Sequence, residues 1–230
     1  MISKGAAMKK IVLMLPLILT ALILTACSSK QELVGADRIE ALRAAAKDYN
    51  SATYIITNLD SGETEQTFSF MYDADGLQIY FHEGLDADGY YAEYSSGKEL
   101  FRENKGIGSA VLSSEESYVS YTKKKSHPYS TGELFFYIDQ YVFSAEETTD
   151  DEGNTVYIYQ YDTERLNKET GMNMDRFATL YAFDGEGNFV YFRQTNSGSD
   201  GSYAYEVTLE NVNDITSIEN PIKIGSETDE

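Results

Sequence analysis

Residues that carry most covalent and metal chemistry are scarce in this sequence. Its 230 residues include one cysteine, two histidines and no tryptophan. One cysteine excludes an internal disulfide, so the folded domain depends on a packed core. His82 and His127 are too few for a histidine-based metal site unless carboxylates complete it. We expect surface or packing roles for both histidines, and we predict no metal and no cofactor.

The recognised catalytic motifs are missing as well. The sequence holds no G-x-S-x-G, no H-E-x-x-H and no glycine-rich phosphate-binding loop. Paired carboxylates occur in any chain this acidic, so none can be singled out as an acid–base pair. We therefore predict a protein without catalytic residues, and an unrecognised hydrolase remains the least favoured alternative.

Basic residues are few: 18 lysines and arginines face 38 aspartates and glutamates, giving a net charge of −20. Such a surface repels nucleic acid and anionic lipid head groups, so neither is an expected partner. The one basic run, Lys123–Lys125, is expected to be a solvated loop.

The single cysteine, Cys27, ends a stretch typical of an export signal. Lys9 and Lys10 precede a nearly continuous apolar run, Ile11–Leu24. This run is shorter than the roughly 20 residues that a membrane-spanning helix needs. A basic head followed by a short apolar core is the arrangement of an export signal.

The residues Leu24-Thr25-Ala26-Cys27 resemble the lipobox of bacterial lipoproteins. In that family the cysteine carries diacylglycerol and becomes the first residue of the mature protein. The resemblance implies that residues 1–26 are removed, that Cys27 is lipidated, and that the domain lies on the extracytoplasmic side of the cell membrane. Each buried CH₂ contributes about 0.8 kcal/mol, so two acyl chains anchor firmly. An ordinary signal with an incidental thiol and an uncleaved anchor helix are the alternatives.

After Cys27 the chain predicts one α+β domain. We expect a polar tether at 27–32, a single antiparallel-sheet domain at 33–222 and an acidic disordered tail at 223–230. Apolar residues recur at three- and four-residue steps over 33–49, which predicts one amphipathic helix. The 19 tyrosines and 11 phenylalanines suit strands that have one wet face.

Alternating apolar and polar residues from Ala52 onward predict antiparallel strands joined by short turns. The predicted strands lie at 68–72, 77–82, 90–94, 99–103, 155–161, 177–183, 189–194 and 203–209. Residues 147–154 read as an acidic loop, and 162–175 as a polar excursion with one helical turn.

The middle of the chain lacks alternation. Residues Thr131–Phe143 predict a short, aromatic helix with Thr131 as its N-cap. Its apolar face comprises Leu134, Phe135, Ile138, Tyr141 and Val142. This face either fills the core or forms one wall of a ligand cavity.

The order of helix, strands, middle helix and closing meander resembles the LolA/LppX-type half-barrel lipoproteins. In these a curved antiparallel sheet wraps helices around an apolar cavity. The resemblance covers about 33–222 and implies a non-catalytic lipoprotein that binds a lipid or an acyl chain between sheet and helices. Some relatives carry an arginine that reaches into the cavity, but the sequence does not place it here. The alternative is an envelope sensor or assembly subunit that binds another protein through its sheet surface.

Four acidic turns could be read either as hairpin turns or as calcium loops. They are Asp73/Asp75, Asp86/Asp88, Asp150/Asp151/Asn154 and Asp184/Glu186/Asn188. Calcium takes six to eight oxygen ligands, and none of these turns continues into a twelve-residue EF-hand loop. Aspartate and glycine also favour turns for backbone reasons alone. We therefore expect structural turns.

Overall fold

The computed structural model describes residues 33–86, 89–104, 109–112, 135, 137–171, 173–199 and 201–223. The chain divides into two compact units, Met1–Leu33 and Val34–Glu230, and all described helices and strands belong to the second unit. The expected signal peptide, Cys27 and the tether lie outside the described residues. So do Lys123–Lys125, His127, Leu134 and all of the expected tail after Lys223.

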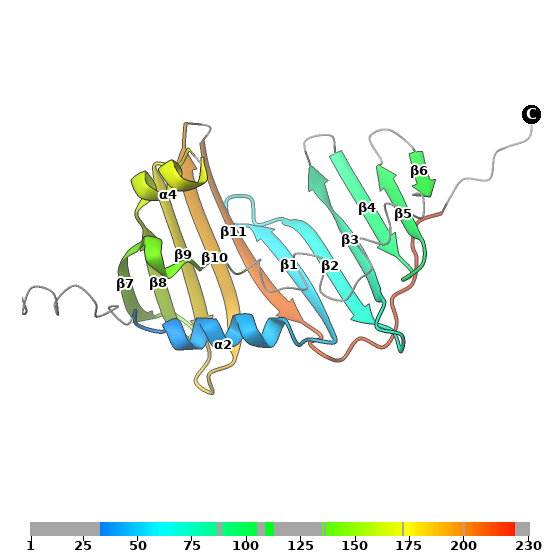
Figure 1. Ribbon diagram of the computed structural model, residues 1–230, viewed down its shortest axis with the longest axis horizontal. Coiled ribbons are helices and arrows are strands. Elements are labelled where there is room, and N and C mark those ends of the chain that lie inside the picture. Colours follow the sequence, from blue (N-terminus) through cyan, green and yellow to red (C-terminus); the bar gives the residue numbers. More distant parts are fainter. Residues whose placement is uncertain are drawn as a thin grey trace, which may run out of the picture. The chain divides into compact units, whose positions relative to one another are not determined.

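Most of the described residues belong to one antiparallel sheet of eleven strands (Figure 1). Two meanders build it. The first contains β1 (Ser51–Asn58), β2 (Thr64–Tyr72), β3 (Gln78–Asp86), β4 (Gly89–Ser95), β5 (Leu100–Asn104) and β6 (Ser109–Leu112). The second contains β7 (Val142–Thr149), β8 (Thr155–Tyr161), β9 (Arg176–Phe183), β10 (Phe189–Gly198) and β11 (Gly201–Glu210).

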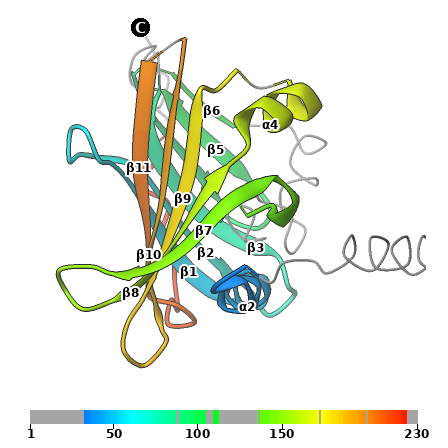
Figure 2. The ribbon, with the colours of Figure 1, turned by 90° about the vertical axis from the view of Figure 1, so that its left-hand side faces the viewer.

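The first and last strands join the two meanders, because β1 pairs with β11 at the centre of the sheet. Among the described strands, β6 and β7 stand at the two ends of the strand order and do not pair with each other. The sheet is curved (Figure 2). The predicted α+β class, with a curved and open antiparallel sheet, is confirmed.

Helix α2 (Ala36–Ala46) lies on one face of the sheet, called the inner face here, and buries Ile39, Leu42 and Ala46. It begins later than predicted because Gly35 has a left-handed backbone (φ 74°) and lies against the ring of Tyr157. A Cβ at Gly35 would come within 2.4 Å of Tyr157 Cδ1, so only glycine fits at this entry to the helix.

The second helix, α4 (Thr163–Thr170), lies within the predicted polar excursion and on the same face as α2 (Figure 2). The carboxylate of its N-cap residue, Asp162, accepts a hydrogen bond from the backbone N–H of Arg165 at 3.0 Å. Gly171 ends the helix in a left-handed conformation (φ 76°). Leu166 is fully buried and holds the helix to the rest of the unit.

The predicted helix over Thr131–Phe143 is wrong for the described part of that segment. Residues 137 and 138 are irregular, Asp139–Tyr141 is one 3-10 turn (η2), and β7 begins at Val142. The segment follows no single period because its aromatic side chains have different partners: Phe135 packs on Tyr54 and Phe192, Tyr137 packs on Tyr159, and Tyr141 bonds to α4. Such tertiary contacts override local propensity. The predicted acidic loop at 147–154 is likewise shorter, since β7 extends to Thr149.

An aromatic layer covers the inner face. Its rings meet in sequence from β3 to β8: Tyr80, Phe68, Phe70, Tyr54, Phe135, Phe192, Tyr181 and Tyr159. Each of these eight rings is at most 1% exposed. Aromatic pairs at such distances stabilise the fold by roughly 0.5–1.5 kcal/mol beyond their area burial.

The opposite, outer face is partly covered by the segment after β11. Ile218 and Ile222 pack on Ala92 and Tyr94 of β4. The backbone N–H of Asn213 donates to the carbonyl oxygen of Ser51 at 2.8 Å and fixes the start of this segment. No helix within the described ranges is long and apolar enough to cross a membrane.

Candidate functional site

One arginine of α2 lies near three buried tyrosines, Tyr137, Tyr161 and Tyr181. Arg43 projects from α2, and its Nη1 donates a hydrogen bond to the carbonyl oxygen of Tyr137 at 3.1 Å. Its Nε is buried and has no hydrogen-bond partner in the described part of the chain. A buried guanidinium N–H without a partner is costly, so this position is suited to an added acceptor.

The tyrosines around Arg43 are neutral at physiological pH. Burial, with smaller contributions from Asp139 and Glu40, raises the pKa of Tyr137 to about 12, and nearby Arg43 opposes this rise. Burial also raises the pKa values of Tyr161 and Tyr181, and the guanidinium again acts in the opposite sense. These phenols therefore stay protonated, and no carboxylate among the described residues is hydrogen-bonded to the Arg43 guanidinium.

The residues expected to form a cavity wall do not share one face. Phe135 is fully buried, and its ring packs on two rings of β10. The centroid distances are 5.2 Å to Phe189 and 5.9 Å to Phe192. Tyr141 is 6% exposed, whereas Ile138 and Val142 are half-buried. Phe135 thus fills the core, whereas Tyr141 lies beside α4, where its hydroxyl donates to Glu169.

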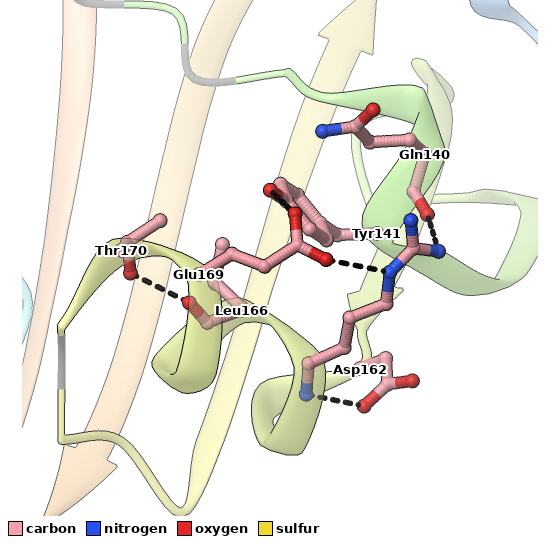
Figure 3. Close-up of polar contacts among 7 residues, drawn as sticks. Gln140, Tyr141, Asp162, Leu166, Glu169 and Thr170 are labelled. Carbon is pink, nitrogen blue, oxygen red and sulfur yellow. Dashed lines mark hydrogen bonds and ion pairs between the residues drawn. The ribbon is translucent and has the colours of Figure 1, made fainter.

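Polar contacts tie η2 to α4 (Figure 3). The hydroxyl of Tyr141 donates to Glu169 Oε2 at 2.6 Å, and Arg165 Nε contacts Glu169 Oε1 at 3.1 Å. Arg165 Nη1 also donates to the carbonyl oxygen of Gln140 at 2.9 Å. The Tyr141 and Arg165 hydrogen bonds lower the pKa of Glu169, so this exposed network stays charged and holds the middle segment in place.

A pocket of about 720 Å³ opens on the outer side of the sheet near the start of α4. Gln160, Ala178 and Thr195 form one register row across β8, β9 and β10. Ala178 points away from the inner face, because its neighbours Phe177 and Thr179 face inward toward Tyr161. The wall of the pocket also contains Phe143, Tyr161, Asp162, Thr163, Glu164, Asp175, Arg176 and Phe177. None of the four described residues of the predicted cavity wall lines it.

The acidic turns use their carboxylates to close hairpins. Asp184 Oδ1 accepts backbone N–H bonds from Glu186 at 2.9 Å and from Asn188 at 2.8 Å, and its Oδ2 accepts from Asn188 Nδ2 at 2.9 Å. Asp150 makes the corresponding bonds with Glu152 and Asn154.

These hydrogen bonds lower the pKa of both aspartates. Asp73 closes the β2–β3 turn in a similar way. The side chains of Asp86 and Asp88 are not among those that the structure describes. The positions of the described aspartates follow from turn geometry.

His82 is packed within the sheet. Its Nε2 lies 3.0 Å from the hydroxyl of Tyr91, and its ring contacts Phe68 edge-on at 5.6 Å. Burial lowers the pKa of His82 to about 4, against the opposing influence of Glu93 and Glu83. In the part of the chain that can be described, no three histidine, cysteine or carboxylate side chains cluster as metal ligands.

No protein-family model matches the sequence, and no curated protein matches it either. Among solved structures, the chain is similar to LprF from Mycobacterium bovis, with 13% identity, a TM-score of 0.48, and coverage of 81% of this chain and 96% of that chain. It is also similar to the Mycobacterium tuberculosis lipoprotein LppX, with 11% identity, a TM-score of 0.43, and coverage of 80% and 98%. Both likenesses concern the fold alone, and they agree with the predicted resemblance to LppX-type proteins.

Proposed function

We propose that this chain is an exported lipoprotein that binds an apolar ligand, a lipid or an acyl chain, between the inner face of its sheet and its helices. In this proposal Cys27 carries the lipid that anchors the chain to the bacterial cell membrane, with the domain on the extracytoplasmic side. The proposed role needs no catalytic group, cofactor or nucleic acid. The observation that carries the proposal is the surroundings of Arg43.

Those surroundings suit an amphiphile. The aromatic layer of the inner face is closed in this structure, so an acyl chain would bind by parting this layer from the segments packed on it. Each CH₂ buried there contributes about 0.8 kcal/mol. Arg43 supplies a cation within this layer, and its Nε has no acceptor among the described residues. A carboxylate or phosphate oxygen at the end of an acyl chain would satisfy that N–H by a charge-assisted hydrogen bond.

A titration with a fluorescent fatty acid tests this proposal. The chain carries Cys27→Ser so that it is released from membranes, and it is compared with a second variant, Arg43→Gln. Loss of a hydrogen bond to a charged group costs about 1.5–3 kcal/mol, so affinity is expected to fall at least about tenfold.

Arg38→Gln is the matched control on the same helix, because the Arg38 guanidinium lies 5.9 Å from the rings of Tyr157 and Phe183 at a more exposed position. It should leave affinity within about twofold. Saturable binding that is equally strong in both arginine variants would remove Arg43 from the site. No binding by the parent would contradict the function itself.

A further inference from the structure

Phe143 is the most exposed of the large apolar side chains described, with 66% of its surface open to solvent. It is the extra residue of a β-bulge in β7, because Val142 pairs with Tyr161 whereas Ser144 pairs with Gln160. Phe143 also lines the outer pocket. A bulge re-aims a side chain and is a built feature of a sheet, so here a phenylalanine is held at the mouth of a pocket.

The strand that carries Phe143 stands at the end of the strand order, and no described strand pairs with its far side. An edge strand offers unpaired N–H and C=O groups to another extended segment. β7 is eight residues long, enough for a partner strand to form a short ladder. This edge, unpaired among the described strands, and the pocket therefore lie next to each other on β7.

Negative charge surrounds this edge. Asp162, Glu164 and Asp175 line the pocket, with Arg176 as the one basic residue of its lining. On β7, Glu146 pairs in register with Ile158, which packs in the apolar cluster of the outer face. Because this cluster and the pocket share the outer face, Glu146 points to the same side as the pocket. Charged residues on an edge discourage pairing with copies of the same acidic chain.

We propose that β7 and the outer pocket form a docking site for an extended, basic segment of a partner protein. The segment adds as a strand to the free edge of β7, an interaction known from other sheet proteins as β-augmentation. An apolar side chain of the segment enters the pocket beside Phe143. A lysine or arginine two positions away lies on the same side of the added strand and faces Glu146. Tyr161 and Phe177 also line the pocket, but both side chains are buried against the inner face. Phe143 and Glu146 lie outside the surroundings of Arg43, so variants at these two residues test this site separately from lipid binding.

The test is peptide binding to the full lipidated chain in nanodiscs made of lipids without net charge. The probe is a fluorescein-labelled decapeptide, Val-Thr-Lys-Thr-Val-Thr-Lys-Thr-Val-Thr, which places valine and lysine two positions apart on one side of the added strand. In the valine–glutamate version glutamate replaces each lysine, and fluorescence anisotropy reports binding. We expect saturable binding that weakens as salt is raised, because exposed charges are screened. Empty nanodiscs and a valine–glutamate peptide should show no binding. A third peptide, methylated at alternate backbone nitrogens, should also fail because it cannot form the ladder.

Two variants and two matched controls locate the site. Phe143→Ser and Glu146→Lys should each lower the affinity for the valine–lysine peptide by about tenfold. Leu85→Ser, at a side chain that is 52% exposed on β3, and Glu63→Lys, in the turn between β1 and β2, should leave binding within about twofold.

Three outcomes overturn the proposal. Equal losses in the controls would mean non-specific attraction to an acidic surface. Undiminished binding of the methylated peptide would exclude strand addition. Sedimentation that shows a dimer of the parent, lost in Phe143→Ser, would make a second copy the occupant of this edge.

Discussion

The ring of Phe135 lies edge-on to the ring of Phe192, with centroids 5.9 Å apart and planes at 84°. Phe192 belongs to β10, whereas Phe135 belongs to the irregular segment before β7. The same phenylalanine also meets Tyr54 of β1 at 6.2 Å. One side chain of the middle segment thus packs on both meanders next to the place where β1 and β11 join them.

Replacing Phe135 should therefore destabilise the fold strongly. Phe135→Ala leaves a cavity in a fully buried position and should lower the free energy of unfolding by about 3–5 kcal/mol. Phe143→Ala, at an exposed position, should change it by no more than about 0.5 kcal/mol. Urea unfolding followed by circular dichroism measures both values. Similar values for the two variants would contradict the assignment of Phe135 to the core.

The Asp184 turn should contribute stability only where its carboxylate is charged. Hydrogen bonds lower its pKa in the folded chain, so its contribution is fully present above the unfolded pKa of about 3.9. The contribution is lost as pH falls through the lower, folded pKa. Asp184→Asn should thus lower the melting temperature at pH 7, and the difference from the parent should shrink toward pH 2. Glu186→Gln, in the same turn, is the charge-matched control and should change little at either pH.

His82 should make the fold sensitive to mild acid. Its folded pKa of about 4 lies below the unfolded value of about 6.5, so protonation favours the unfolded chain. The contribution of neutral His82 to the free energy of unfolding is fully present above pH 6.5. It falls by about 3 kcal/mol as the pH drops to 4.

His82→Phe should remove this loss, because a phenyl ring does not titrate and can pack between Phe68 and Tyr91. Urea unfolding at pH 7 and pH 4 gives the two free energies. A variant that loses as much stability as the parent between these pH values would show that other groups dominate the acid response.

Cys27→Ser tests the proposed anchor. The variant should leave the membrane fraction or accumulate as an unprocessed precursor, because neither diacylglycerol attachment nor the subsequent cleavage can occur without the thiol. Metabolic labelling with a radioactive fatty acid, followed by fractionation, measures both effects. Labelling and membrane association equal to those of the parent would contradict lipidation at Cys27.

Much of the sheet was predictable because its strands have one buried and one wetter face. β10 and β11 pair as the predicted antiparallel strands, and the turn Asp184–Asn188 ends β9 as expected. β7 was not predictable in this way. It is an edge strand with mostly exposed side chains, so no burial pattern marks it, and it begins inside an aromatic run.

The role of Arg43 could not be predicted from the sequence, for a different reason. Its position on α2 lies between apolar residues of the helical stripe and reads as part of the polar face. Its long side chain nevertheless reaches Tyr137, which lies far along the chain. The outer pocket is also non-local, since its lining comes from β7, β8, β9, β10 and the start of α4. No local pattern in the sequence reports such a juxtaposition.

Native mass spectrometry of the full chain, extracted gently from membranes, tests the proposed function most directly. We expect a population heavier than the lipid-modified protein by the mass of one lipid or fatty acid. This extra mass should be released by mild activation and should be depleted in Arg43→Gln but retained in Arg38→Gln. A spectrum with only the mass of the protein and its Cys27 anchor, unchanged after incubation with added phospholipid and fatty acid, would contradict the account.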